Sequence, residues 1–407
     1  MANTITAMVP KVLARGLLVL REQSILPRLV QSYSDTAAAN KGDVITIPVA
    51  DSGTVRSVTP AVTQAANQDR APTKQTITLD QWKESTFYLT DKQLEEMDAD
   101  STFVPLSMSG SIKALANTID DYIHGLYTGI YSHSGVPGTT PFATSLNEFR
   151  DARKRMNQEA APMEDRRVVL GSDAEANALN LSQFLQAEQR GDQGGIIRGE
   201  LGRLVGSTWY LDQRIDASGN QHTAGTWGIT GTGYNEVKAA VTAGVSTIII
   251  QGNSSTTTNG GTLVVGDVFR VNGDSSQQYV VKTAASIAVG AQKTLSVNFS
   301  PALRKGVAIG ATVEFESASG SGGDGPTNHE VNLMFHPQAI GFASRTLADS
   351  SSRSGSLGSV FSTAVDPISG VALRLEVNRQ YKQTTWSFDT LYGATLIRPE
   401  LACRIMG

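Results

Sequence analysis

The chain has 407 residues, which is enough for two or three folding units with cores of their own. Charged residues make up 18% and aromatic residues 6%, and 34 basic against 38 acidic residues leave a net charge of -4. This balance excludes the strong overall field of a dedicated nucleic-acid binder. The apolar run Gly16 to Leu20 is too short for a signal peptide or a membrane span, and Cys403 has no partner for an intramolecular disulfide. We therefore expect a soluble protein that is stabilised by packing.

Residues 1–41 predict a helical arm, because Val9, Val12, Leu13, Leu17 and Leu20 recur at helical spacing. Residues 42–92 predict a strand and an extended loop. The apolar residues of Val44 to Val49 form a short strand, and a second β-rich run covers Thr76 to Thr90. The polar segment between the two runs is long for a compact hairpin, which favours an extended two-stranded arm.

Residues 93–215 predict a long spine helix over Pro105 to Tyr131, followed by an αβα unit. The spine has an apolar stripe at steps of three and four, formed by Met108, Ile112, Leu115, Ile119, Tyr122, Ile123, Leu126 and Ile130. Two further helices have capping-box sequences at their starts, Ser145 with Glu148 and Ser172 with Glu175. A short strand, Arg167 to Leu170, lies between them in the sequence.

Residues 216–326 predict an inserted all-β domain, because charge becomes sparse and short β-runs alternate with turns rich in Gly, Ser and Thr. The expected strands are Thr247 to Gln251, Thr262 to Val271, Gln278 to Thr283, Thr294 to Phe299 and Ala311 to Glu316, spaced as in a small barrel. Ser317 to Gly325 serves as the return linker.

In residues 327–407 the mixture of predicted helices and strands found before the insert resumes. We expect a strand at Glu330 to Phe335, a helix opened by Pro337, and a hairpin of two strands. Val371 to Val377 alternates apolar with polar residues, and Gln383 to Leu391 pairs as the next strand. The predicted fold class is α+β with an inserted small all-β barrel.

The sequence contains no recognisable catalytic or cofactor motif. The glycines of Gly194 to Gly206 lack the Lys-Ser/Thr ending of a P-loop, there is no G-x-S-x-G elbow, and the five histidines have no metal-ligand spacing. A hydrolase would need a convergent nucleophile, base and oxyanion donors, which the sequence does not supply. We therefore predict no enzyme activity, no cofactor and no metal site.

Several residues are candidates for contacts between copies of the chain. Arg56, Arg70 and Lys74 lie on the long polar arm, and Trp82 beside it is either packed within the hairpin or an anchor in a neighbouring subunit. The basic cluster Arg150, Arg153, Lys154 and Arg155 has Glu148, Asp151 and Glu159 next to it. It is therefore either a solvated helix face with internal ion pairs or a charge patch between subunits.

The order of these elements resembles the major capsid proteins of tailed bacteriophages over nearly the whole chain. The likeness lies in Gly42 to Val49, the spine Ile112 to Ile130, Glu148 to Met156 with Arg167 to Gly171, Ile197 to Gly206, Asn332 to Ile340, Asp389 to Ala394, and Arg398 to Glu400. The resemblance implies the tailed-phage capsid fold, with an amino-terminal arm, extended loop, spine helix, and peripheral and axial domains. The inserted β domain is similar to that of a branch of short-tailed phages.

The resemblance implies a protein that forms hexamers and pentamers of an icosahedral shell in the virion, assembled in the cytoplasm of the host bacterium. Its implied partners are a separate scaffolding protein, a portal protein, a decoration protein in some relatives, and double-stranded DNA held by weak non-specific contact, with no membrane. Some relatives crosslink Lys to Asn, and Lys74 and Lys83 are the candidate donors here. No local pattern identifies the Asn or an activating Glu, so we do not predict the crosslink. The alternative is a phage tail or adhesin protein, which the Ser, Thr and Gly-rich insert suggests but which would lack the spine helix and αβα unit.

Overall fold

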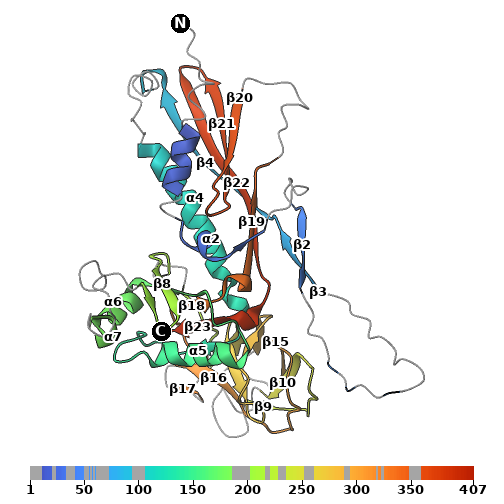
Figure 1. Cartoon of the computed structure of the whole chain (residues 1–407). Helices are drawn as coiled ribbons and strands as arrows, with labels where there is room; N and C mark the ends of the chain where they lie inside the picture. Colours follow the sequence, from blue (N-terminus) through green and yellow to red (C-terminus); the bar gives the residue numbers. More distant parts are fainter. Residues whose placement is uncertain are drawn as a thin grey trace. The chain divides into compact units, whose positions relative to one another are not determined.

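The computed structural model in Figure 1 divides into two compact units. Unit 1 comprises residues 1–28, 32–116 and 341–397, and unit 2 comprises residues 29–31, 117–340 and 398–407. The structure describes residues 12–20, 24–33, 42–49, 55, 57, 60, 73–93, 106–185, 202–215, 221–227, 235–251, 261–287, 294–317, 320–321, 325–347 and 359–407. Besides the longer helices and strands, these residues include three short elements: α2 (Leu26–Leu29), β1 (Gln31–Ser32) and η3 (Pro399–Leu401).

Unit 1 is built on an antiparallel sheet, in which β20 pairs with β21, β21 with β22, and β22 with β4. The bounds of these strands are Ser359–Val365 (β20), Ala372–Gln380 (β21), Gln383–Leu396 (β22) and Gln81–Thr90 (β4). The strand β19, Ile340–Arg345, also pairs with β22. The predicted hairpin of Val371 to Val377 with Gln383 to Leu391 is confirmed.

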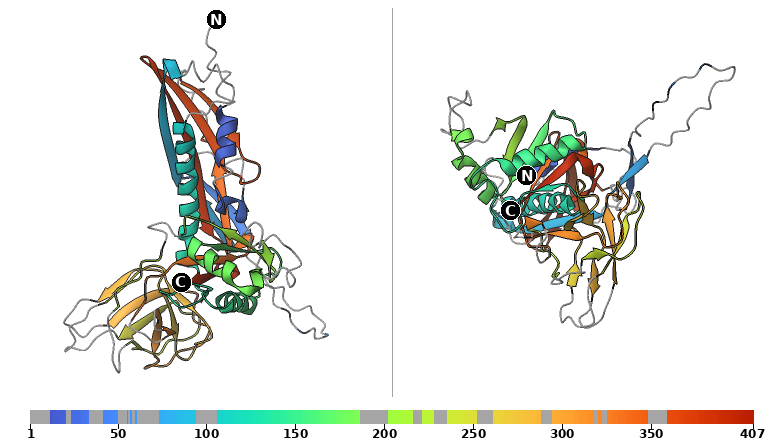
Figure 2. Two further views of the ribbon diagram at one scale, coloured as in Figure 1. Left: turned by 90° about the vertical axis from the view of Figure 1, so that its left-hand side faces the viewer. Right: turned by 90° about the horizontal axis from the view of Figure 1, so that it is seen from below.

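One face of this sheet is apolar and covered by helices. Leu373, Leu375 and Val377 are buried while Arg374, Glu376 and Asn378 are not, as the alternation predicts. Figures 1 and 2 show α4, Leu106–His124, lying along the sheet. A helix at residues 12–20 packs beside it, because a methyl group added at Gly16 would lie 3.2 Å from Ile112 Cδ1 and 3.3 Å from Phe388 Cε1.

The spine prediction is confirmed in its apolar stripe, since Met108, Ile112, Leu115, Ile119 and Ile123 are all buried. The α-helix is shorter than predicted at its carboxyl end. It stops at His124, and a 3-10 helix, η1 (Gly125–Gly129), continues the chain toward Tyr131. The predicted start at Pro105 lies outside the described residues.

The predicted two-stranded arm is present as β2, Val44–Val49, paired with β3, Thr73–Thr78. The β-rich run of Thr76 to Thr90 is not one strand. It divides at Leu79 and Asp80 into β3, which pairs with the arm, and β4, which pairs with β22. The buried apolar cluster at the base of the arm explains why the chain bends there: Leu79 joins Ile45, Ile47, Ile77, Ala343, Leu391 and Ile397.

Unit 2 contains a six-stranded sheet of order β5-β23-β18-β6-β8-β7. Its strands are His133–Ser134 (β5), Ala402–Met406 (β23), Val331–Phe335 (β18), Arg166–Leu170 (β6), Ser207–Leu211 (β8) and Arg203–Leu204 (β7). Its helices are α5 (Asn147–Gln158), α6 (Ser172–Asn180) and α7 (Ser182–Leu185). The chain order α5, β6, α6 confirms the predicted αβα unit, and Phe149, Ala152 and Met156 bury one face of α5.

Three local predictions in unit 2 are wrong. The helix starts are not capping boxes: α5 follows Leu146 and α6 follows Gly171, neither with a side-chain cap. Ser145 Oγ accepts only a long hydrogen bond, 3.4 Å, from the Asn147 amide. Pro337 opens a single 3-10 turn, η2 (Pro337–Ala339), instead of a helix. The reason is tertiary, since the residues that follow enter the buried strand β19.

The predicted β insert forms a nearly closed barrel. Its sheet has the order β17-β16-β12-β13-β15-β10-β9. Two backbone hydrogen bonds connect the β16 side of this sheet to the β9 side: the amide of Val313 donates to Asn235 O at 2.6 Å, and that of Val237 donates to Ala311 O at 2.8 Å. The strands are Gly320–Ser321 (β17), Val313–Ser317 (β16), Val268–Val271 (β12), Tyr279–Val281 (β13), Thr294–Ser300 (β15), Thr247–Gln251 (β10) and Glu236–Val237 (β9). The run Thr262 to Val271 is two strands, since Gly261–Leu263 (β11) pairs separately with Ala285–Ile287 (β14). The expected linker after Ser317 contains the short strand β17, which pairs with β16.

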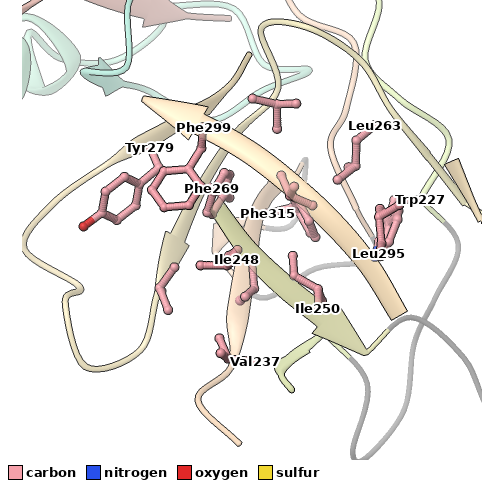
Figure 3. Close-up of a cluster of buried hydrophobic side chains, with 14 of the residues drawn as sticks. Trp227, Val237, Ile248, Ile250, Leu263, Phe269, Tyr279, Leu295, Phe299 and Phe315 are labelled. Atoms are coloured by element: carbon pink, nitrogen blue, oxygen red, sulfur yellow. The ribbon is translucent and has the colours of Figure 1, made fainter. Parts of the chain in front are cut away.

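The barrel has its own core, shown in Figure 3. Phe269 lies at its centre and is fully buried, with its ring centroid 5.7 Å from those of Tyr279 and Phe299 and 5.9 Å from that of Phe315. Apolar residues on the inward faces of the strands complete the cluster: Trp227, Val237, Ile248, Ile250, Leu263, Leu295, Val297 and Val313. The aromatic side chains supply much of the buried area, which lets a charge-poor segment fold.

Candidate functional site

The described part of the chain contains no group of three or more His, Cys, Asp or Glu that could hold a metal ion. Among these residues, no helix is both long and apolar enough to span a bilayer. Cys403 is completely buried, and burial raises the pKa of its thiol to about 12, so it is not a poised nucleophile. The candidate sites that the sequence predicts are contact surfaces.

The first surface is the arm. Ile45 and Ile47 on β2 and Ile77 on β3 are buried at its base, while the alternate residues of both strands are exposed. Further along the loop, the side chain of Val55 is 99% exposed. Lys74 is exposed on β3 opposite Pro48, whereas Arg56 and Arg70 lie outside the described residues. The arm is thus anchored at one end and carries an apolar side chain in solvent beyond it.

Trp82 lies on β4 and not on the arm, so packing within the arm hairpin is excluded. It is 48% exposed, and its indole N–H donates to Asp389 Oδ2 at 3.3 Å. The Arg374 guanidinium also binds Asp389, with Nε 2.9 Å from Oδ1. Trp82 is therefore oriented by a carboxylate on the open face of the unit 1 sheet, and it remains available as an anchor for a neighbour.

The basic cluster on α5 divides between two roles. Arg153 Nη1 donates to Val205 O at 3.0 Å, and Arg155 Nη1 donates to Ser276 O of the barrel at 3.2 Å. Arg150 and Lys154 are exposed and form no ion pair with any described residue. Glu159 turns to the barrel, where it accepts from Arg304 Nη2 at 2.7 Å. Within the described residues, the side chains of Arg150 and Lys154 are therefore not paired with the nearby acids.

A polar junction that no sequence pattern predicted joins the barrel to the rest of unit 2. His133 Nε2 of β5 lies 3.0 Å from Glu316 Oε1 of β16, and Arg270 Nη2 lies 2.9 Å from the same oxygen. Gln278 of the barrel accepts from the His133 amide at 2.8 Å and donates to its carbonyl at 3.0 Å. The barrel is thus held by side chains 145 residues away in the sequence.

The protonation states at this junction follow from burial and charge. Burial lowers the pKa of His133, and the hydrogen bond with Glu316 opposes that shift. Burial alone would raise the pKa of Glu316, but the hydrogen bond from His133 and the charges of His133 and Arg270 bring it below its usual value. The contact between His133 and Glu316 therefore opposes the effect of burial on the pKa of His133, and together with Arg270 it overcomes the effect of burial on the pKa of Glu316.

A second buried contact lies around Arg404 of β23. Its Nε donates to Ile130 O at 2.7 Å and its Nη1 to Gly266 O of the barrel at 2.8 Å, while its guanidinium lies 5.4 Å from the centre of the Tyr127 ring. His222 connects the same region, with its ring nitrogens near Tyr127 Oη (3.3 Å) and Asp267 Oδ1 (2.9 Å). Gly266 has φ +102°, and a side chain there would meet His222 at 3.0 Å. No short motif predicts these contacts, because they join residues far apart in the chain.

No protein-family model and no curated protein sequence matches the chain. Solved structures resemble its backbone: one of Mycobacterium phage Che8 has 12% identity and a TM-score of 0.46, over 94% of this chain and 91% of the other. The capsid of cyanophage P-SCSP1u has 12% identity and a TM-score of 0.45, over 94% and 87%. The mature capsid of bacteriophage PhiM1 has 9% identity and a TM-score of 0.44, over 94% and 86%. With TM-scores below 0.5, these likenesses carry no functional conclusion by themselves.

Proposed function

We propose that the chain is the major capsid protein of a tailed bacteriophage, which assembles with copies of itself into the icosahedral shell around the genome. The main support for this proposal is the geometry of the arm. Its base is fixed by the buried side chains of Ile45, Ile47 and Ile77, while Val55 stands almost fully in solvent. Exposing an apolar side chain on an anchored hairpin gains the subunit nothing by itself, but it suits a segment that is covered on assembly.

The rest of the described surface fits a subunit that is completed by neighbours. Trp82 is exposed on an open sheet face, and Arg150 and Lys154 carry charge without a described internal partner. Aromatic residues and arginine are the types enriched where protein surfaces meet. The tail or adhesin alternative is not favoured, because the chain has the spine helix α4 and the αβα unit that it would lack.

Partners and location follow from the proposed function. The copies form hexamers and pentamers, with a portal protein at one vertex and a separate scaffolding protein during assembly in the cytoplasm of the host bacterium. Double-stranded DNA is contacted weakly and without sequence preference, which suits a net charge of -4. The proposed role is structural and involves no catalysis or cofactor.

Electron microscopy and sedimentation velocity of the purified chain, with and without scaffolding protein, test the proposal. Closed shells or tubes are expected, because copies with one repeated interface close symmetrically. Deleting residues 55–68 should leave the melting temperature of the monomer nearly unchanged and abolish or weaken shell formation. Protein that stays monomeric under every condition contradicts the proposed function. Normal shells from the deletion variant, or an unfolded monomer, contradict the role given to the arm.

A further inference from the structure

A groove beside helix α5 is lined by cationic side chains. It has a volume of about 670 Å³, and the described residues of its lining include Arg150, Arg153 and Lys154 but no Asp or Glu. Its apolar lining includes Val205, whose side chain is 42% exposed. A groove whose lining combines apolar and cationic side chains is suited to an acidic protein segment, because it can accommodate both the apolar atoms and the carboxylates.

Two of the cations in this groove, Arg150 and Lys154, make no side-chain hydrogen bond or ion pair with a described residue, whereas Arg153 donates to Val205 O. Arg150 and Lys154 are four residues apart on one helix face, where like charges destabilise a helix. The acids nearby in the sequence do not relieve this within the described residues: neither Glu148 nor Asp151 forms an ion pair with the Arg150 or Lys154 side chain, and Glu159 pairs with Arg304. Because these two charges have no partner in the described part of the chain, they are suited to an anion outside the subunit.

The same unit offers a matching acidic surface at the first turn of α6. Asp173 is exposed and Glu175 is half-buried, and neither forms an ion pair within the described residues. Burial raises the pKa of Glu175, and no nearby cation offsets that shift within the described part of the chain. A cation supplied from outside would remove this penalty, just as an outside carboxylate would relieve the α5 groove.

We propose that the α5 groove of one copy receives the first turn of α6 from a second copy, with Arg150 and Lys154 facing Asp173 and Glu175. This rests on the proposed self-assembly and names one of its contacts. The two surfaces are different parts of the subunit, so the contact is heterologous and leaves a free groove and a free α6 on each pair of copies. Repetition then adds further copies until the arrangement closes.

Charge reversal in the full-length chain tests the contact. The groove variant combines Arg150→Glu with Lys154→Glu, the α6 variant combines Asp173→Lys with Glu175→Lys, and a third variant combines all four changes. The control reverses two exposed lysines of the barrel, Lys282→Glu and Lys305→Glu. For each variant, calorimetry checks that the subunit is folded. Sedimentation velocity and electron microscopy then give the protein concentration at which assembly begins.

The groove variant and the α6 variant should each raise the concentration needed for assembly about tenfold or more, because each contact changes from attraction to repulsion. The four-residue variant should return toward the wild-type value, and the control should match the wild type. Assembly of the groove variant at the wild-type concentration overturns the proposal. A four-residue variant that needs as high a concentration for assembly as the groove variant or the α6 variant also overturns it.

The same variants distinguish a protein contact from DNA binding in the groove. DNA binding that is lost in the groove variant while its assembly is normal assigns the groove to phosphate and overturns the protein contact. Higher salt should weaken assembly of the wild type and strengthen that of the groove variant, since screening acts on attraction and repulsion alike. Wild-type protein that never assembles overturns the proposed function together with the contact that rests on it.

Discussion

His133 and Glu316 lie 3.0 Å apart, Nε2 to Oε1, although one belongs to β5 of the six-stranded sheet and the other to β16 of the barrel. Both are almost completely buried, and Arg270 completes the group at 2.9 Å from the same oxygen. Val313 and Phe315, on the same strand as Glu316, point into the barrel core. One face of β16 thus packs in the barrel core, and the other face binds the barrel to β5.

Glu316→Ala should lower the free energy of unfolding by about 3 kcal/mol, because removing one partner of a buried charged group leaves Arg270 and His133 without their acceptor. Urea unfolding at pH 7 measures the change. Glu314→Ala on the same strand is the matched control and should cost less than about 1 kcal/mol, since Glu314 is only half-buried. A double-mutant cycle with His133→Ala should show coupling above about 0.5 kcal/mol, and additive effects would contradict the contact.

Acidification should destabilise the protein from about the ordinary pKa of histidine downward. Burial lowers the pKa of His329 from 6.5 to about 3, so between these values the unfolded chain binds a proton that the folded chain does not. The contribution of neutral His329 to the free energy of unfolding is therefore fully present above pH 6.5. It is lost as pH falls toward 3, by up to about 1.4 kcal/mol per pH unit. His329→Gln should flatten this dependence between about pH 6 and about pH 4, measured by urea unfolding. His336→Gln, at the other end of the same strand and half-exposed, should change it less, and equal slopes in all three proteins would show that His329 does not cause the dependence.

The base of the arm should be sensitive to a single methyl group at Gly393. A Cβ there would clash with Thr78 O, because β22 and the end of β3 cross without room for a side chain. Gly393→Ala should therefore destabilise unit 1 by more than about 1 kcal/mol, measured as a lower melting temperature. The control is Gly110→Ala on α4, where nothing lies within 4 Å. Gly110→Ala should be neutral or stabilise the protein by up to about 1 kcal/mol. A neutral or stabilising effect of Gly393→Ala would show that the crossing of β22 and β3 has room for a side chain.

Residues 216–326 expressed alone should fold into the barrel, since the strands from Glu236 to Ser321 close on themselves around Phe269. Dispersed amide NMR signals and cooperative melting are expected. The isolated barrel should melt at a lower temperature than in the full chain, because Glu316 and Gly266 lose their partners His133 and Arg404. Phe269→Ala in the same fragment, with an expected cost of about 3 to 5 kcal/mol, should abolish cooperative melting. A disordered spectrum from the unmodified fragment would show that the predicted boundaries are wrong.

Elements whose burial pattern repeats along several residues could be predicted from the sequence alone. The alternation over residues 371–377 predicted a half-buried strand, and the stripe from Met108 to Ile123 predicted a helix on a sheet; both are confirmed. Four strands of the barrel, β10, β13, β15 and β16, lie within a residue or two of their predicted bounds. The alternation of apolar and polar residues along one element is enough to predict its type and its buried face. These predictions therefore needed no knowledge of which distant segments pack against the element.

The ends of elements and the partners of polar side chains depended instead on tertiary contacts. Ser145 and Ser172 have the sequence of capping boxes, but the N-cap positions are Leu146 and Gly171. Pro337 begins one 3-10 turn, because the next residues enter a buried strand. The four cations of α5 looked alike in sequence. Arg155 reaches the barrel, whereas Arg150 and Lys154 remain without a described partner. Such differences depend on which distant segment lies within hydrogen-bond reach, and the contact between His133 and Glu316 exists only because the barrel folds back against β5.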